Sequence, residues 1–277
     1  TNRKKISDMQ TGKFFLNKKK DFNFSRIKKI KFTSEIRNIA SCNTYIVAVP
    51  TPIDLKRNPD LSALKKASHT IGNVIKAGNL VIFESTVFPG ATEQICVPII
   101  EKKSKLFLNK DFLVGYSPER ISPGDKKRGL KNIVKVVSGS NKRALKCVDS
   151  LYSKIISKGT FKVSAIKVAE ASKIIENIQR DVNIALMNEA AIIFNELGID
   201  IEEVVDAAKT KWNFQPYTPG LVGGHCIGVD PYYLSHKAKS IGVHSDLILT
   251  SRRINEFMPT YVSKRIKKSL QKKKINL

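Results

Sequence analysis

Short hydrophobic runs alternate with amphipathic stretches along the first 160 residues of the chain. Continuous apolar runs are typical of strands buried on both faces of a sheet, and such runs lie within residues 45–52, 80–90, 112–120 and 132–140. Helical periodicity occurs between them, over 61–78, 92–104 and 141–155. Because strands and helices alternate, residues 1–160 are predicted to form an α/β domain with a mainly parallel sheet. Residues 1–35 are basic and weakly patterned.

Helical periodicity alone continues after about residue 160. The stretch 164–198 keeps this periodicity and ends near a glycine, where helices commonly stop. Shorter helices are predicted over 200–210 and 230–242. Residues 161–277 are therefore expected to form a second, all-α domain.

Polar residues follow three of the predicted strands. Thr51 lies in "PTP", Thr86 in "ESTVFPG", and Glu119 and Arg120 in "SPER". The carboxyl ends of parallel strands meet at one edge of a sheet, where ligands of α/β proteins bind. One such turn is usually only a turn, whereas three in one α/β unit predict a binding site at this edge.

Three polar residues lie close together on the predicted long helix. Lys173 and Asn177 are four residues apart and Arg180 follows, so helical geometry places them in one stripe. A solvated helix face is the common interpretation of such a stripe. One wall of a polar cleft is the alternative, because an asparagine beside a lysine can stabilise a developing oxyanion.

The segment "GGHCIGVDPYY" holds the most informative cysteine. Gly223 and Gly224 allow close approach of the backbone to a ligand and positive φ angles. If a helix begins near residues 228–230, Cys226 lies just before its N-terminus, a position that lowers a thiol pKa, and Asp230 lies in its first turn. This setting favours a nucleophile over a small buried hydrophobic residue. Burial is the expectation for the other three cysteines, Cys42, Cys96 and Cys147.

His225 beside Cys226 suggests two further interpretations, a cysteine–histidine hydrolase and a zinc site. Neighbouring side chains of an extended segment point in opposite directions, which disfavours the first. Zinc needs three or four ligands, and neither C-x-x-C nor H-x-x-x-H spacing is present, so no metal is expected.

The amino-acid composition indicates which kinds of binding partner the chain could have. The formal net charge is +25, from 49 Lys and Arg against 24 Asp and Glu. The lysines are spread along the chain, which favours a compositional bias with an anionic small ligand; a basic nucleic-acid-binding protein is the alternative. No apolar run has the length of a membrane span or a secretory leader, so no membrane partner is expected, and the scattered cysteines indicate the cytoplasm.

Taken together, these segments resemble the UDP-glucose/GDP-mannose dehydrogenase family of nucleotide-sugar 6-dehydrogenases. The resemblance runs over nearly the whole chain and is carried, in the family's order, by "VAVPTP", "ESTVFPG", "YSPERISPGD", "AEASKIIEN", "NEAAIIFNELGID" and "PGLVGGHCIGVDPYYL". It implies a partial Rossmann-like NAD-binding domain and a helical domain that forms a homodimer through the long helix 165–197. Arg120 after "SPE" is most like the branch that acts on UDP-N-acetylhexosamines for surface polysaccharides and O-antigens.

The resemblance also implies a reaction, the oxidation of a C6 alcohol to a carboxylate with two NAD+. Cys226 would bind the sugar covalently, first as a thiohemiacetal and then as a thioester. The other implied roles are oxyanion stabilisation by Lys173 and Asn177, proton transfer through water by Lys173 and Asp230, positioning of the hydrolytic water by Glu119 and Thr86, contact with NAD by Thr51 and Thr86, and binding of the UDP-sugar by Glu119, Arg120, Ile121, Lys173, Asn177, Arg180 and Gly223.

Both ends of the chain depart from the family pattern. The first strand and the G-x-G-x-x-G turn that bind the NAD pyrophosphate are not found, since "GLVGG" at 220–224 follows no predicted strand. The C-terminal UDP-binding domain is not expected within the chain either. We therefore expect a fragment that by itself binds NAD weakly or not at all. An inactive remnant that only dimerises is the alternative to an active dehydrogenase.

Overall fold

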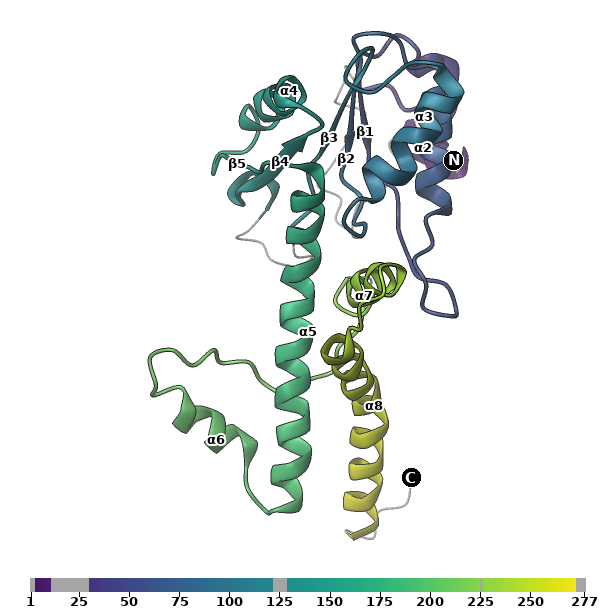
Figure 1. Ribbon diagram of the computed structural model, residues 1–277. Coiled ribbons are helices and arrows are strands. Elements are labelled where there is room, and N and C mark those ends of the chain that lie inside the picture. The colour runs from purple at the N-terminus through teal and green to yellow at the C-terminus, as the bar shows by residue number, and fades with distance from the viewer. Residues whose placement is uncertain (1–2, 11–29, 122–128, 225, 273–277) are drawn as a thin grey trace.

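The structure, a computed structural model, describes residues 3–10, 30–121, 129–224 and 226–272. A sheet domain and a helical domain share one long helix (Figure 1). The strands are β1 (Thr44–Val47), β2 (Leu80–Phe83), β3 (Leu113–Tyr116), β4 (Lys135–Gly139) and β5 (Thr160–Lys162). The helices are α1 (Arg3–Gln10), α2 (Ser62–Gly72), α3 (Val97–Ser104), α4 (Lys142–Ser153), α5 (Ile166–Glu196), α6 (Ile201–Ala208), α7 (Asp230–Ser240) and α8 (Asp246–Lys272), with short helices η3 (Ile36–Ile39), η4 (Thr92–Cys96) and η5 (Leu130–Asn132).

The sheet has the order β1-β2-β3-β4-β5 and confirms the mainly parallel α/β prediction. β1, β2 and β3 are parallel, and β4 and β5 are parallel, but β4 runs antiparallel to β3. In that pair Gly115 lies opposite Gly139 and Tyr116 opposite Ser138. The start of β4 consequently lies beside the carboxyl end of β3, at the edge where the sequence predicts a site.

The predicted burial holds for β2 and β3 and is wrong for β1. Every residue of β2 and β3 is buried. In β1, Tyr45 and Val47 pack into the core with Leu64 of α2, whereas Ile46 is 51% exposed. Successive side chains of a strand point to opposite faces, so β1 is covered on the α2 face alone.

Three elements were not predicted individually. α1 lies in the weakly patterned basic segment, and β5 is a short strand with an exposed Phe161. α8 continues through Pro259, although a proline inside a helix removes one backbone hydrogen bond. The tertiary packing of α8 against α5 offsets this local loss.

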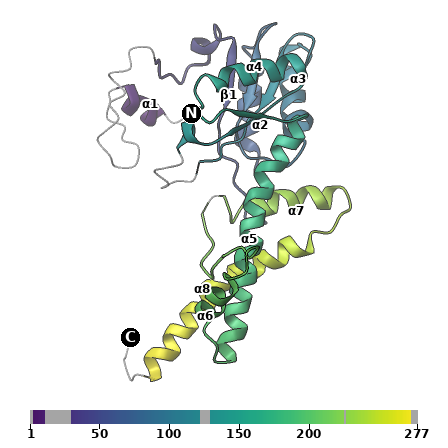
Figure 2. The ribbon, with the colours of Figure 1, turned by 90° about the vertical axis from the view of Figure 1, so that its left-hand side faces the viewer.

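α5 confirms the predicted long helix and connects the two domains. Near its N-terminus, Ile166, Ala169 and Ile174 belong to the same core cluster as β2 and β3. Farther along, α5 packs against α8, and α7 lies between the sheet domain and α8 (Figures 1 and 2). Residues on successive turns of α5 can therefore contact the strand ends and α7 at once.

Candidate active site

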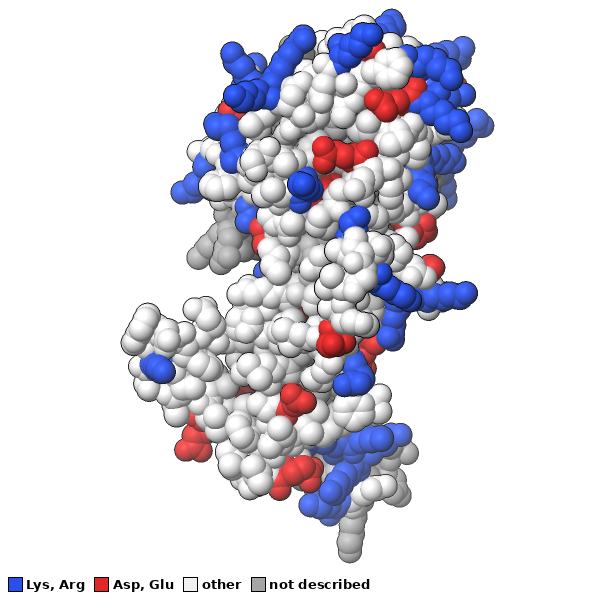
Figure 3. All heavy atoms as spheres, in the orientation of Figure 1, with Lys and Arg blue, Asp and Glu red and all other residues white. Residues whose placement is uncertain are grey.

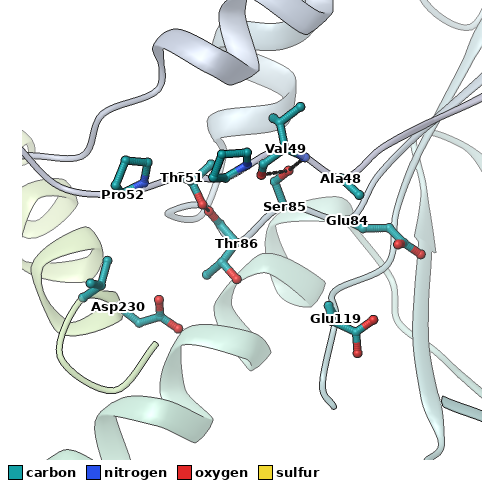
Figure 4. Close-up of a pocket in the computed structure, with 11 residues that line it drawn as sticks. Ala48, Val49, Thr51, Pro52, Glu84, Ser85, Thr86, Glu119 and Asp230 are labelled. Carbon is teal, nitrogen blue, oxygen red and sulfur yellow. Dashed lines mark hydrogen bonds between the residues drawn. The ribbon is translucent and has the colours of Figure 1, made fainter. Parts of the chain in front are cut away.

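A cavity of about 390 Å³ lies at the carboxyl ends of β1 and β2 and is bounded by the start of α7. It is lined by Ala48, Val49, Pro50, Thr51, Pro52, Glu84, Ser85, Thr86, Glu119, Val229 and Asp230. Figure 4 shows Glu84 and Glu119 toward one end of it and Asp230 toward the other. Three of the predicted strand-end residues thus lie together, at the predicted edge of the sheet.

Hydrogen bonds between side chains and backbone join the loops that follow β1 and β2. The Ser85 hydroxyl donates to the carbonyl of Val49 at 2.7 Å and accepts from its amide at 3.0 Å. The Thr51 hydroxyl donates to the carbonyl of Thr86 at 2.8 Å. These bonds hold the two threonines at the cavity wall.

Tyr233 fastens α7 to the loop after β1. It is fully buried, and its hydroxyl donates to the carbonyl of Thr51 at 2.9 Å. Burial raises the pKa of this hydroxyl, which keeps it protonated and able to donate. The Phe88 ring lies 6.4 Å from the Tyr233 ring. The first turn of α7, with Asp230, is thereby held against the cavity.

Two of the three polar residues in the stripe on α5 are buried. Lys173 is 9% and Asn177 6% exposed, so the solvated-face interpretation is wrong for both, whereas Arg180 is exposed. The Asn177 amide donates to the Asp230 carboxylate at 2.5 Å. α5 and α7 therefore meet through a buried amide–carboxylate pair beside the cavity.

Asp230 has the electrostatics of a proton-transfer group. Burial raises the pKa of its carboxyl to about 6, although the Asn177 hydrogen bond and the charge of Lys173 both lower it. A carboxyl whose pKa lies close to neutral pH both takes up and releases protons readily.

Replacing Asp230 by asparagine is expected to stabilise the fold near neutral pH. The folded pKa of about 6 lies above the unfolded value of about 3.9, so the contribution of Asp230 to stability is fully present below the unfolded pKa and is lost as pH rises toward 6. The asparagine carries no charge and its carbonyl oxygen still accepts from Asn177. Relative to native, the variant should gain about 2–3 kcal/mol in the free energy of unfolding between about pH 4 and about pH 7.5.

Thermal unfolding of both proteins at the two pH values measures this difference. Asp206→Asn is the matched control, because the Asp206 side chain is 73% exposed and its loss should change stability by no more than about 0.5 kcal/mol. A lower midpoint for Asp230→Asn than for native protein near neutral pH contradicts the assignment.

Cys226 lies just before α7, as predicted. Its backbone carbonyl accepts the amides of Val229 at 3.0 Å and Asp230 at 2.9 Å. Its side chain is exposed, and of the two preceding glycines only Gly224 has a positive φ, +86°. These bonds form a turn that leads from Cys226 into Asp230, and Cys226 is not among the residues that line the cavity. His225 lies outside the described residues.

Two of the other three cysteines depart from the expected burial. Cys96 is buried, but Cys42 and Cys147 are exposed. Cys42 lies in the turn before β1, and Cys147 lies on α4 outside the face that carries the buried Ala144, Val148 and Tyr152. The expectation was wrong for these two because it took no account of which helix face or turn they occupy.

The two charged residues of the "SPER" turn lie in different surroundings, Glu119 at the cavity and Arg120 against α5. The Glu119 carboxylate accepts the amides of Arg120 and Ile121, both at 2.7 Å, and Glu119 lines the cavity. The Arg120 guanidinium pairs with Glu176 of α5 at 2.7 Å and donates to the carbonyl of Val134 at 3.0 Å. Arg120 therefore fastens the turn to α5. Ile121, Arg180 and Gly223 are exposed and do not line the cavity.

Sequence reasoning missed three charged residues around the site, the buried Lys135 and Glu170 and the partly buried Glu84. Glu170 is fully buried, and its carboxylate accepts the amides of Gly90 at 2.5 Å and Thr92 at 2.9 Å, which caps the helix after the Thr86 loop. Burial raises its pKa. The sequence did offer one signal for the burial of Glu170, because it lies one helical turn before Lys173 and among apolar residues of α5.

The wider surface is basic, and Figure 3 shows Lys and Arg around the sheet domain and on α8 near the C-terminus. In the described ranges, no three His, Cys, Asp or Glu side chains come together as metal ligands. None of the helices within those ranges is both long and apolar enough to cross a membrane.

Comparison with known proteins assigns the family. Residues 1–156 match the NAD-binding domain, and residues 167–257 the central domain, of the UDP-glucose/GDP-mannose dehydrogenase family. The chain belongs to this family.

Several individual members of this family are similar to the chain over most of its length. A UDP-N-acetyl-D-glucosamine 6-dehydrogenase of Pseudomonas aeruginosa is 58% identical over 90% of this chain and 59% of its own length, and one of Salmonella typhi is 53% identical over 100% and 65%. The solved UDP-D-ManNAc dehydrogenase of Pyrococcus horikoshii superposes with a TM-score of 0.89 at 32% identity, over 99% of this chain and 65% of that one. The chain thus spans 59% to 65% of these relatives.

Proposed function

We propose that this chain is the NAD-binding and central part of a UDP-N-acetylhexosamine 6-dehydrogenase, which makes a uronic acid for surface polysaccharides or O-antigens. The observation that carries the proposal is the buried Asn177–Asp230 pair, in which Asp230 lines the strand-end cavity and lies one helical turn after Cys226. The family and the names of the relatives support the substrate class.

The cavity fits the nicotinamide end of NAD. Val49, Pro50 and Pro52 offer apolar surface to a flat ring, and the fastened Thr51 and Thr86 offer polar groups. When bound, NAD+ accepts the hydride that leaves C6 of the sugar. We propose Thr51 and Thr86 as its contacts in this chain.

Cys226 is the proposed nucleophile. Its sulfur forms a bond to the aldehyde carbon of the half-oxidised sugar, and the resulting thiohemiacetal is oxidised to a thioester that water cleaves. Covalent capture divides a difficult oxidation into easier steps and keeps the aldehyde bound. The exposed thiol before α7 is open to a substrate that enters from outside the cavity.

The surrounding residues stabilise charge and move protons. The ammonium of Lys173 and the amide of Asn177 are proposed to stabilise the oxyanions. Both side chains are buried, and hydrogen-bond donors stabilise developing charge most strongly where water is excluded. Asp230, with a pKa of about 6, exchanges protons with Lys173 through water. Glu119 and Thr86 orient the water that cleaves the thioester.

Substrate contacts by Glu119, Lys173 and Asn177 are consistent with their places at or beside the cavity. Contacts by Arg120, Ile121, Arg180 and Gly223 rest on the family resemblance, because these residues lie outside the cavity lining.

We propose a homodimer through α5. Ile175, Leu186, Ile193 and Leu197 are 52% to 65% exposed, and their spacing places them on one face of the helix. A second copy would cover this apolar stripe. We also propose two domains, 1–160 and 161–277, since β5 ends at Lys162 and α5 begins at Ile166.

NADH formation at 340 nm tests the function. Purified protein receives saturating NAD+ and UDP-GlcNAc, UDP-GalNAc or UDP-glucose in parallel. Two NADH per N-acetylated sugar, with little from UDP-glucose, supports the proposal. A folded dimer that forms no NADH supports the inactive remnant, and nucleic-acid affinity that falls steeply with salt supports the basic binding protein.

A further inference from the structure

A buried lysine lies beneath the site and has no part in the proposed mechanism. Lys135 is the first residue of β4 and is 4% exposed. Its ammonium pairs with the Glu84 carboxylate at 3.1 Å and donates to the carbonyls of Ser117 at 3.4 Å and Pro118 at 3.2 Å. Glu84 follows β2, and Ser117 and Pro118 follow β3. One ammonium therefore contacts the ends of two parallel strands.

The antiparallel direction of β4 makes this contact possible. In a parallel strand the first residue would lie at the opposite edge of the sheet from the site. Because β4 runs against β3, its first residue lies at the carboxyl edge instead. Lys135 thus reaches the site from a strand that contributes nothing to the cavity lining.

Tyr152 of α4 completes the cluster. Its ring lies 5.0 Å from the Lys135 ammonium, and its hydroxyl donates to the same Glu84 oxygen. Burial raises the pKa of this hydroxyl, so it remains a donor. The Glu84 side chain, 17% exposed, accordingly meets a cation and a hydroxyl on its inner side and the cavity on the other.

The cluster borders two residues of the proposed mechanism. Glu119 follows Pro118 directly, and Thr86 lies two residues after Glu84. Figure 4 shows Glu84 and Glu119 near each other at one end of the cavity. The Ser117 amide also donates to the carbonyl of Phe83 at 2.9 Å, so the ammonium adds to a backbone bond between the two strand ends and supplies the positive charge that the Glu84 carboxylate and the two carbonyl oxygens contact.

We propose that Lys135 is a positioning residue: its ammonium holds the ends of β2 and β3 together and so sets Thr86 and Glu119 in place across the cavity. It acts through Glu84 and the two carbonyls. The contacts stand independently, and only the expected effect on catalysis rests on the proposed function.

Three variants separate positioning from stability. Lys135→Met removes the charge at similar length and leaves the partly buried Glu84 carboxylate without its cation, so the midpoint of thermal unfolding should fall by about 5–10 °C. Adding Glu84→Gln removes the stranded charge and should restore most of that midpoint. Lys146→Met, at an exposed position on α4, is the control and should match native protein.

Hydrogen–deuterium exchange gives the deciding measurement. In Lys135→Met, exchange should rise about tenfold or more in peptides covering 84–92 and 117–121 and stay unchanged in α2. The double variant should keep fast exchange at 117–121, because it regains no donor for the carbonyls of Ser117 and Pro118. Native exchange at both strand ends, or an equal rise throughout the sheet, overturns the inference.

Activity adds a second readout that distinguishes this inference from the proposed function. If native protein forms NADH, Lys135→Met should lose about tenfold or more in kcat with KM changed less than about threefold. An active Lys135→Met that equals Lys146→Met overturns the positioning role and leaves the proposed function intact. If native protein forms no NADH, the proposed activity fails for this chain, and the exchange result alone decides the role of Lys135.

Discussion

Replacing Arg252 by methionine is expected to lower the free energy of unfolding by about 3–5 kcal/mol. Arg252 of α8 and Asp181 of α5 form a salt bridge at 2.6 Å, with side chains 4% and 1% exposed. Methionine fills similar space but leaves the Asp181 carboxylate buried without its cation. Burial already raises the pKa of Asp181, and Arg252 is the charge that opposes this shift.

The salt bridge is part of a network of hydrogen bonds between α5 and α8. Asn255 donates to the Asp181 carboxylate at 2.7 Å, and Asn188 donates to Asn255 at 2.8 Å. The Arg252 guanidinium also lies 3.9 Å from the place that a Cβ on Gly228 would occupy. The loop between Cys226 and α7 therefore packs beside Arg252, and loss of the bridge should loosen this loop together with the helix pair.

Urea unfolding of native protein, Arg252→Met and Arg253→Met measures the effect. Arg253 is the adjacent, exposed arginine, so its loss should change stability by no more than about 0.5 kcal/mol. The double variant Asp181→Leu/Arg252→Met removes both charges and should recover most of the lost stability. Equal midpoints for the two arginine variants would mean that the buried charge is compensated in another way.

The sequence predicts the site edge well because two strong local signals coincide there. Apolar runs mark β2 and β3, and Thr86 and Glu119 follow directly after them, so both reach the cavity. The position of Asp230 was predicted from the preference for a carboxylate in the first turn of a helix. These predictions need only the period of a strand and the position of its end.

What the sequence could not predict depends on contacts between distant segments. The direction of β4 follows from pairing with β3, so Lys135 looks like any strand lysine until its partners are known. Burial of Lys173 and Asn177 depends on α7 packing over α5, because one helix alone does not show which face is covered. Arg120 likewise finds Glu176, more than fifty positions later, instead of the cavity.

Cys226→Ser is expected to reduce NADH formation with a UDP-N-acetylhexosamine by on the order of 10³-fold or more. A hydroxyl is nearly isosteric with the thiol, but it is a far weaker nucleophile at neutral pH and cannot form the thioester. The side chain is exposed and its structural contacts run through its backbone carbonyl, so the start of α7 should be preserved. The loss should therefore appear in the rate and leave the unfolding midpoint unchanged.

The chain offers two matched controls for this experiment. Cys42 and Cys147 are exposed like Cys226, and none of the three lines the cavity. Cys42 lies before β1 and Cys147 on α4, whereas Cys226 lies directly before α7 and Asp230. Serine at either position should leave NADH formation within about twofold of native. If all three serine variants retain activity, the exposed thiol before α7 is not the nucleophile. The buried Asn177–Asp230 pair would then have to act on the sugar without a covalent intermediate, which would place the proton chemistry of Asp230 at the center of both oxidations.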